Sequence, residues 1–74
     1  MTDRRIAQTV GARVHDALSA SSISIATVAE ATDLEITDLS DRLTGRSAFT
    51  VRELVRVGGF LHVPPSRFLE GVRA

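Results

Sequence analysis

The absence of cysteine from a chain of only 74 residues limits what this sequence can fold into. A domain of this length buries only about 60% of its unfolded surface, and small secreted domains usually add disulfides to compensate. Without cysteine there is no disulfide framework, no thiolate ligand for zinc and no cysteine nucleophile. We therefore expect one domain, residues 1–74, that folds on a single apolar core.

The composition is that of an ordinary globular domain, with 43% hydrophobic and 24% charged residues. No apolar run approaches the roughly 18 to 20 residues that cross a bilayer, and no uninterrupted apolar export segment follows residues 1–6. We expect a cytoplasmic protein that makes no contact with a membrane.

Apolar side chains recur at helical spacing along the chain, as in Ile6, Val10, Val14 and Leu18, and no segment alternates as a strand would. This pattern predicts an all-α fold of five short helices. They are predicted at residues 4–19, 24–32, 35–44, 51–62 and from 64–66 onward. Of residues 51–62, the pattern assigns the buried side to Leu54, Val55, Val57, Gly58 and Leu61.

Turn and cap residues mark the helix ends. Ser24 suits an N-cap, and Thr50 with Glu53 has the spacing of a capping box. Asp33 tolerates a left-handed backbone in a tight turn, and Gly45 suits the position after a helix. The adjacent glycines at 58–59 lie inside a predicted helix, where we expect them to permit close helix packing.

The nine basic residues, all of them Arg, balance nine acidic ones, so the formal net charge is zero. The charges are segregated, because residues 30–41 hold only acidic ones: Glu30, Asp33, Glu35, Asp38 and Asp41. Residues 42–74 hold six Arg against Glu53 and Glu70. Arginine favours planar, bidentate contacts to phosphate or guanine.

Two short helices at about residues 24–44, joined by a tight turn, make a helix-turn-helix. Val28-Ala29 is similar to the Leu-Ala pair of the Cro and phage-repressor (XRE) family, and Leu34 to its turn hydrophobe. Residues 38–46, DLSDRLTGR, are similar to its Thr-Leu-Ser-Arg-Arg-Leu-x-Gly-Arg stretch. Residues 50–54 and 61–69 are similar to its last two helices. The chain thus resembles a lambda-repressor-like helix-turn-helix domain, with Asp33 and His62 where that family usually has Gly.

The resemblance implies double-stranded DNA as the partner, with the third helix in the major groove. Ile36, Thr37, Ser40 and Asp41 would then contact bases. Ile36 suits a thymine methyl group, the hydroxyls of Thr37 and Ser40 suit any base, and Asp41 can accept from cytosine N4. The phosphate contacts are expected from Ser24, Arg42, Arg46, Ser47 and Arg52, with help from Arg4, Arg5 or Arg13.

Structural alternatives exist for several of these residues. Arg46 and Arg52 could be solvated surface residues, and Arg42 could pair with Asp38 at the i, i+4 spacing. Ile36 could be a partly buried core side chain, and Asp41 could pair with a neighbouring Arg.

Other chemistry has little support. His15 and His62 lie on different elements without ligand partners at metal spacing, so neither predicts a metal site. No nucleophile-elbow motif or glycine-rich phosphate loop is present, and we expect neither a cofactor nor an enzyme. Phe49, Phe60 and Phe68 are spaced as core residues rather than as a base-stacking platform.

The sequence therefore favours a sequence-specific DNA-binding transcription regulator, Cro-like or repressor-like, of a kind that phages and prophages encode. A homodimer would suit a symmetric operator, and Phe68 and Leu69 are candidates for its seam. The alternative is a protein-interaction module whose acidic second and third helices bind a basic protein partner. Architectural or excision-type DNA binding shares the same fold signal and would be distinguished by DNA bending.

Overall fold

The computed structural model describes residues 4–71, and within that range it contains helices and no strand. The helices are α1 (Arg4–Ala20), α2 (Ile25–Thr32), α3 (Ile36–Thr44), α4 (Val51–Leu61) and α5 (Pro65–Phe68). The predicted all-α fold of five helices is confirmed. The third helix begins at Ile36 rather than Glu35, because Glu35 is extended at the N-cap position and makes no side-chain cap.

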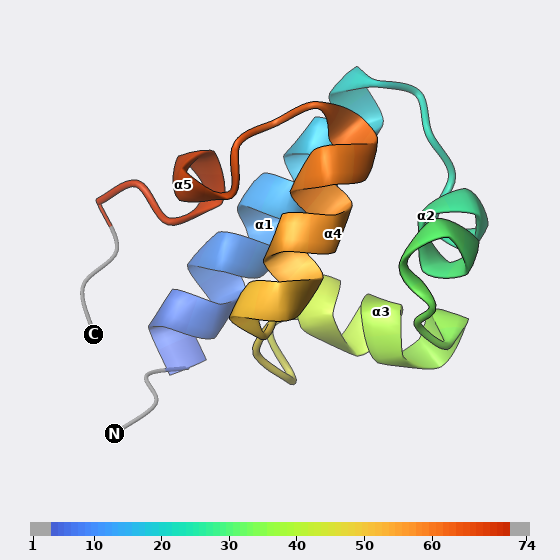
Figure 1. Ribbon diagram of the computed structural model, residues 1–74. Coiled ribbons are helices and arrows are strands. Elements are labelled where there is room, and N and C mark those ends of the chain that lie inside the picture. Colours follow the sequence, from blue (N-terminus) through green and yellow to red (C-terminus); the bar gives the residue numbers. More distant parts are fainter. Residues whose placement is uncertain (1–3, 72–74) are drawn as a thin grey trace.

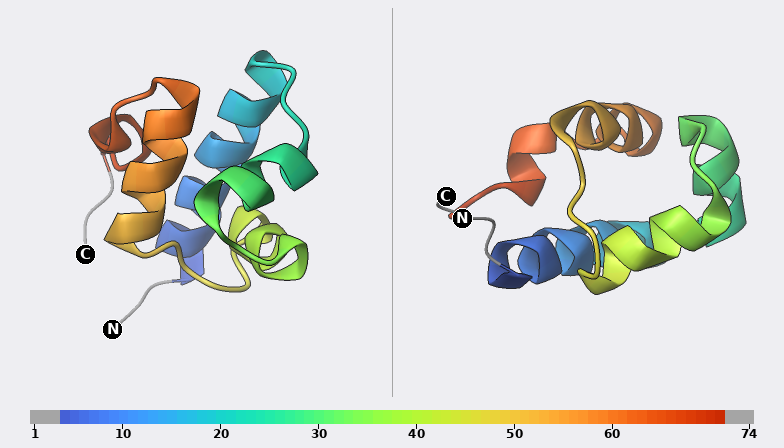
Figure 2. Two further views of the ribbon diagram at one scale, coloured as in Figure 1. Left: turned by 45° about the vertical axis from the view of Figure 1, so that its right-hand side comes forward. Right: turned by 90° about the horizontal axis from the view of Figure 1, so that it is seen from below.

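The helices form two layers with the short helices at their ends (Figure 1). Seen from below, α1 and α3 lie in one layer and α4 lies opposite them, while α2 and α5 close the two ends (Figure 2). The first turn of α4 and the loop before it come down beside the C-terminal end of α3 (Figure 1). This arrangement leaves one side of α3 free of other helices.

The apolar core fills the space between the layers. Every helix contributes to it, and the bulkiest side chain that is almost fully enclosed is Phe68 of α5. The core residues are Val10, Val14, Leu18, Val28, Ala29, Leu39, Leu43, Leu54, Val57, Leu61 and Phe68. Val55, which the sequence pattern assigned to the buried side of α4, is instead 52% exposed. The buried residues of α4 are only Leu54, Val57, Gly58 and Leu61, so the buried stripe of this helix is narrower than predicted.

The predicted helix ends are confirmed by hydrogen bonds and dihedral angles. The Ser24 hydroxyl accepts from the Thr27 amide at 3.1 Å, and Thr50 and Glu53 form the capping box at the start of α4. Asp33 and His62 end α2 and α4 with φ of 63° and 60°, so both occupy the left-handed region without being glycine. Such a residue lets the chain reverse within a few residues.

Two glycines allow helices to approach closely. A Cβ on Gly11 of α1 would lie 2.6 Å from the Leu43 carbonyl oxygen, so glycine is what lets α1 pack against the backbone of α3. A Cβ on Gly58 would collide with the Val63 carbonyl oxygen, whereas one on Gly59 would meet nothing within 4 Å. The predicted packing role is confirmed for Gly58 and wrong for Gly59, which is exposed.

Candidate nucleic-acid interface

The outer side of α3 carries the side chains that the sequence assigned to base contact. Ile36 is 51% exposed, and Thr37 and Ser40 are exposed as well. Leu39 and Leu43, on the opposite side of the same helix, are buried and hold it against the core. The alternative that Ile36 belongs to the core is therefore wrong. An apolar side chain and two hydroxyls face outward together.

The turn before α3 fixes its position relative to α2. Leu34 is half-buried against the core, and its amide donates to the Ala29 carbonyl oxygen at 2.9 Å. Inside α2, the buried Thr32 hydroxyl donates to the Val28 carbonyl oxygen at 2.7 Å. The Leu34 bond ties the turn to the end of α2, and the Thr32 bond lies within the last turn of α2 itself.

Arg42 is held by α4 and not by the carboxylate of Asp38. Its Nε donates to Glu53 Oε1 at 2.8 Å, and its Nη1 donates to the backbone carbonyl oxygen of Asp38 at 3.1 Å. The two side chains of the ion pair are only 19% and 15% exposed. The predicted Arg42–Asp38 ion pair is therefore wrong, and Arg42 links α3 to α4 instead.

The Glu53 carboxylate accepts hydrogen bonds from the Arg42 Nε at 2.8 Å and from the Thr50 amide at 3.0 Å. Burial opposes its ionisation, but hydrogen bonds from the Thr50 amide and from Arg42, together with the Arg42 charge and the Thr50 hydroxyl, hold the pKa of Glu53 below its ordinary value of 4.5. Glu53 is therefore ionised at neutral pH and can anchor Arg42. The capping-box motif was visible in the sequence, whereas the second partner of Glu53 was not.

Two arginines near the end of α3 remain open to a ligand. Arg46 and Arg52 are exposed, and within residues 4–71 neither side chain has a hydrogen-bond or ion-pair partner. Ser47 lies between them in sequence and is half-buried, with its amide donating to the Asp41 carbonyl oxygen at 3.3 Å. Ser24 lies at the start of α2, where its hydroxyl already caps the helix.

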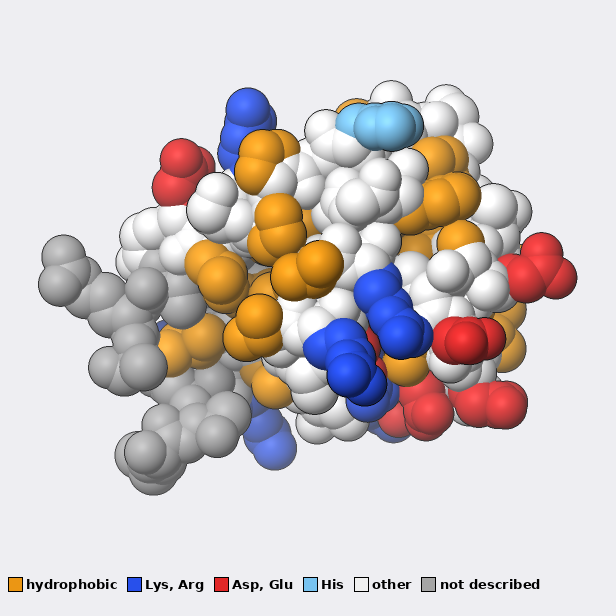
Figure 3. All heavy atoms as spheres, in the orientation of Figure 1, with side chains coloured by type: hydrophobic (Ala, Val, Ile, Leu, Met, Phe, Trp, Pro, Cys, Tyr) orange, Lys and Arg blue, Asp and Glu red, His pale blue; other side chains and the backbone are white. Residues whose placement is uncertain are grey.

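The acidic stretch is exposed beside these arginines. Glu30, Asp33, Glu35 and Asp38 are exposed and Asp41 is half-buried. Within the described range, none of these five carboxylates forms an ion pair, so the predicted pairing of Asp41 with an Arg is not found. Figure 3 shows acidic side chains at the lower right, over the region of α3, and basic ones at the lower centre, over the base of α4.

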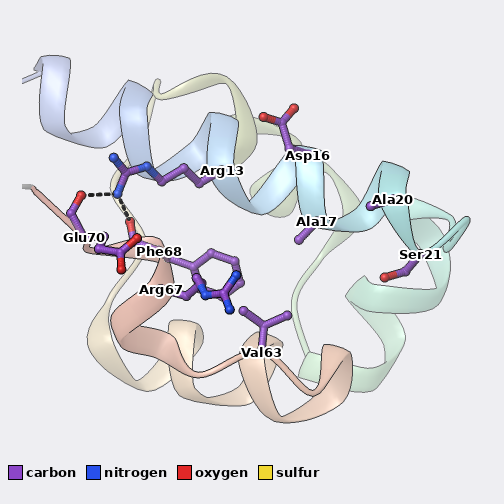
Figure 4. A pocket seen from close by; sticks show the side chains of 9 residues that line it. All are labelled: Arg13, Asp16, Ala17, Ala20, Ser21, Val63, Arg67, Phe68 and Glu70. Atoms are coloured by element: carbon purple, nitrogen blue, oxygen red, sulfur yellow. Dashed lines mark hydrogen bonds between the residues drawn. The ribbon is translucent and has the colours of Figure 1, made fainter.

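Arg13 lies elsewhere and has a structural role. Its guanidinium donates to the backbone carbonyl oxygens of Phe68 and Glu70, which ties the segment after α5 to α1 (Figure 4). These contacts lie in a cavity of about 510 Å³ between α1 and the α5 region. Acidic and basic side chains both line it, including Asp16, Arg67 and Glu70. Arg13 is thus not among the arginines at the end of α3.

The dimer candidates have different environments. Phe68 is 2% exposed and enclosed by its own chain, so the prediction that it lines a dimer seam is wrong. Leu69 is 39% exposed, and two residues on successive turns of α4, Val51 and Val55, are 71% and 52% exposed. Figure 3 shows apolar side chains gathered over α4 and toward α5. The sequence pattern missed Val55 because it counted that residue in the buried stripe, and it gave Val51 no role beyond the start of the helix.

Among residues 4–71 no group of three or more His, Asp or Glu side chains is arranged to hold a metal ion. Within the same range, no helix has both the length and the apolar character needed to cross a membrane. Comparison with models of known protein families, with curated proteins and with solved structures gives no match. The candidate interface therefore rests on the geometry of this chain alone.

Proposed function

We propose that this chain is a sequence-specific DNA-binding transcription regulator of the Cro or phage-repressor kind, with α3 in the major groove. The observation that carries the proposal is the outer side of α3. Ile36, Thr37 and Ser40 are exposed there, while Leu39 and Leu43 fix the helix from behind. A methyl-bearing side chain and two hydroxyls suit base edges, and an α-helix, about 10–12 Å across, suits a major groove about 12 Å wide.

The affinity would come from the unpaired arginines beside α3. Arg46 and Arg52 flank the loop before α4, where they can reach the phosphates on one side of the groove. Asp38 and Asp41 oppose this attraction, because carboxylates repel phosphate. Such an interface gains its specificity from α3 and its strength from a few arginine contacts, so binding would weaken as salt rises, with a slope set by the number of those contacts.

Selection from a pool of random duplexes tests the proposal directly. The purified chain is bound at low salt, the retained DNA is sequenced, and the affinity is then followed as salt rises. We expect an enriched motif and a Kd that weakens with salt. Failure to bind any duplex at low salt would contradict the proposal.

Two variants separate the roles of the residues. Arg46→Ala should weaken binding to all sequences and lower the salt slope, because it removes a phosphate contact. Thr37→Ala should change base preference and leave the salt slope unchanged, because a hydroxyl releases no counterion. An equal loss on every sequence for both variants would be incompatible with these roles.

A basic protein partner is the second candidate. The five acidic side chains of residues 30–41 make no ion pair within the described residues, which leaves them available to a positively charged surface. Under this hypothesis Asp38→Asn with Glu35→Gln would weaken protein binding, whereas under the DNA hypothesis the same pair would tighten non-specific DNA binding. Anisotropy with labelled duplex and with a labelled basic peptide distinguishes the two.

A further inference from the structure

A polar pocket of about 270 Å³ lies where the first turns of α1 meet the end of α3. Its lining residues are Arg4, Gln8, Thr44, Gly45 and Arg46, so two arginines far apart in sequence share one small cavity. Gly45 makes this possible, because a Cβ there would collide with Gln8 and its backbone has φ of 85°. The close approach of Gly45 to Gln8 brings the end of α3 against the first turns of α1.

Within residues 4–71, no acidic side chain lines this pocket. In the same range, neither the Arg4 nor the Arg46 side chain has a hydrogen-bond or ion-pair partner. The larger cavity beside α5 differs, because Asp16 and Glu70 line it and Arg13 is already bound there. Two like charges in one small pocket favour an anion between them.

Two backbone carbonyl oxygens at the end of α3 already accept hydrogen bonds from the protein. The Asp41 carbonyl oxygen at the end of α3 accepts from the Arg46 amide at 2.9 Å and from the Thr44 hydroxyl at 3.1 Å. The Arg42 carbonyl oxygen accepts from the Gly45 amide at 3.3 Å. Within residues 4–71, no hydrogen bond engages the guanidinium groups of Arg4 and Arg46 or the side-chain amide of Gln8, so these donors remain for a ligand.

We propose that Arg4, Gln8 and Arg46 form a binding site for a phosphate group. Guanidinium donors match the oxygens of a phosphate in a bidentate manner, and a neutral amide adds a hydrogen bond without changing the charge. The pocket adjoins the end of α3 and the loop that carries Ser47, so a DNA strand on that side would place a backbone phosphate in it. The placement of a DNA phosphate in this pocket rests on the proposed function, and it extends the DNA contact to the first turn of α1.

The experiment uses inorganic phosphate as the probe and the full chain as the receptor. Amide resonances are followed by two-dimensional NMR during a phosphate titration, against sodium chloride at equal ionic strength. Arg4→Gln removes one guanidinium, and Arg67→Gln is its control, since it removes the same charge from an exposed side chain that does not line this pocket. Circular dichroism checks that both variants keep the fold.

Phosphate should shift the resonances of Gln8, Thr44, Gly45 and Arg46 saturably, and chloride should not. Arg4→Gln should abolish the saturation, and Arg67→Gln should retain it. If the wild-type chain and Arg4→Gln respond alike, the site does not exist. That result would leave the proposed DNA binding standing if the wild-type chain still selects a duplex motif.

Duplex DNA identifies the source of the phosphate group. If it belongs to the DNA backbone, Arg4→Gln should lower the slope of log K against log[salt] by about 0.9, the value for one phosphate contact. An unchanged slope in a variant that has lost phosphate saturation would overturn the backbone contact and support a free phosphorylated molecule as the ligand. Phosphate saturation without any DNA binding would contradict the proposed function but not the site.

Discussion

Two neighbouring glycines in α4 have opposite roles. Gly58 is buried against the Val63 carbonyl oxygen, whereas the space around Gly59 is empty to 4 Å. Gly58→Ala should destabilise the fold by about 1–3 kcal/mol, because the new methyl group forces the helix away from the segment that leads to α5. Gly59→Ala should stabilise it by about 0.5–1 kcal/mol, because alanine restricts the unfolded chain and favours the helix. Urea unfolding of both variants measures the difference.

Each glycine variant is the control for the other, since both make the same chemical change one residue apart in one helix. A similar shift of the unfolding midpoint in both would show that helix propensity alone decides the outcome, and the packing argument for Gly58 would fail.

Among the elements, α3 and α4 are coupled by the Arg42–Glu53 ion pair. Glu53→Gln can keep the capping hydrogen bonds, because glutamine also serves at this capping-box position, but it removes the charge that Arg42 faces. We expect a loss of about 1–2 kcal/mol at pH 7, between the values for exposed and buried pairs. Thermal unfolding of Glu53→Gln, Arg42→Gln and the double variant measures the coupling between the two side chains.

The same pair makes stability depend on pH. The pKa of Glu53 in the fold lies below its ordinary value of 4.5, so the ionised form binds its partners more tightly than the protonated form. The stabilisation is complete above 4.5 and is lost as the pH falls through the lower, folded value. The stability difference between the wild-type chain and Glu53→Gln should therefore shrink in acid. A constant difference from pH 7 to acid would be inconsistent with an ionised Glu53 as the anchor.

The elements themselves could be predicted from local chemistry, and the contacts between them could not. Ser24, Thr50 and Gly45 mark helix ends through bonds to residues three or four positions away, so their roles are visible in the sequence. The partner of Arg42 lies eleven positions away on another helix, and the pocket places Arg4 of α1 together with Arg46, which follows α3. The prediction that Val55 is buried failed for a related reason. An apolar residue at the edge of the apolar stripe of a helix is buried or exposed according to which neighbouring elements pack beside it.

For the whole molecule, the apolar surface over α4 bears on assembly. Val51 and Val55 project from successive turns and Leu69 is exposed after α5, which is more apolar exposure than single scattered side chains give. If these residues form the two-fold contact of a DNA-bound dimer, one substitution appears twice in the interface. The fold itself would be unaffected, because all three side chains lie outside the core.

Val55→Asp should therefore abolish dimers without lowering the stability of the monomer, since it places two charges into one apolar contact. Analytical ultracentrifugation should show a monomer, and affinity for a palindromic duplex should fall while affinity for its half-site stays the same. Phe60→Asp is the control, because residue 60 lies about 140° around α4 from residue 55. A dimer that survives Val55→Asp, or an unchanged preference for the palindrome, would place the contact elsewhere on the molecule.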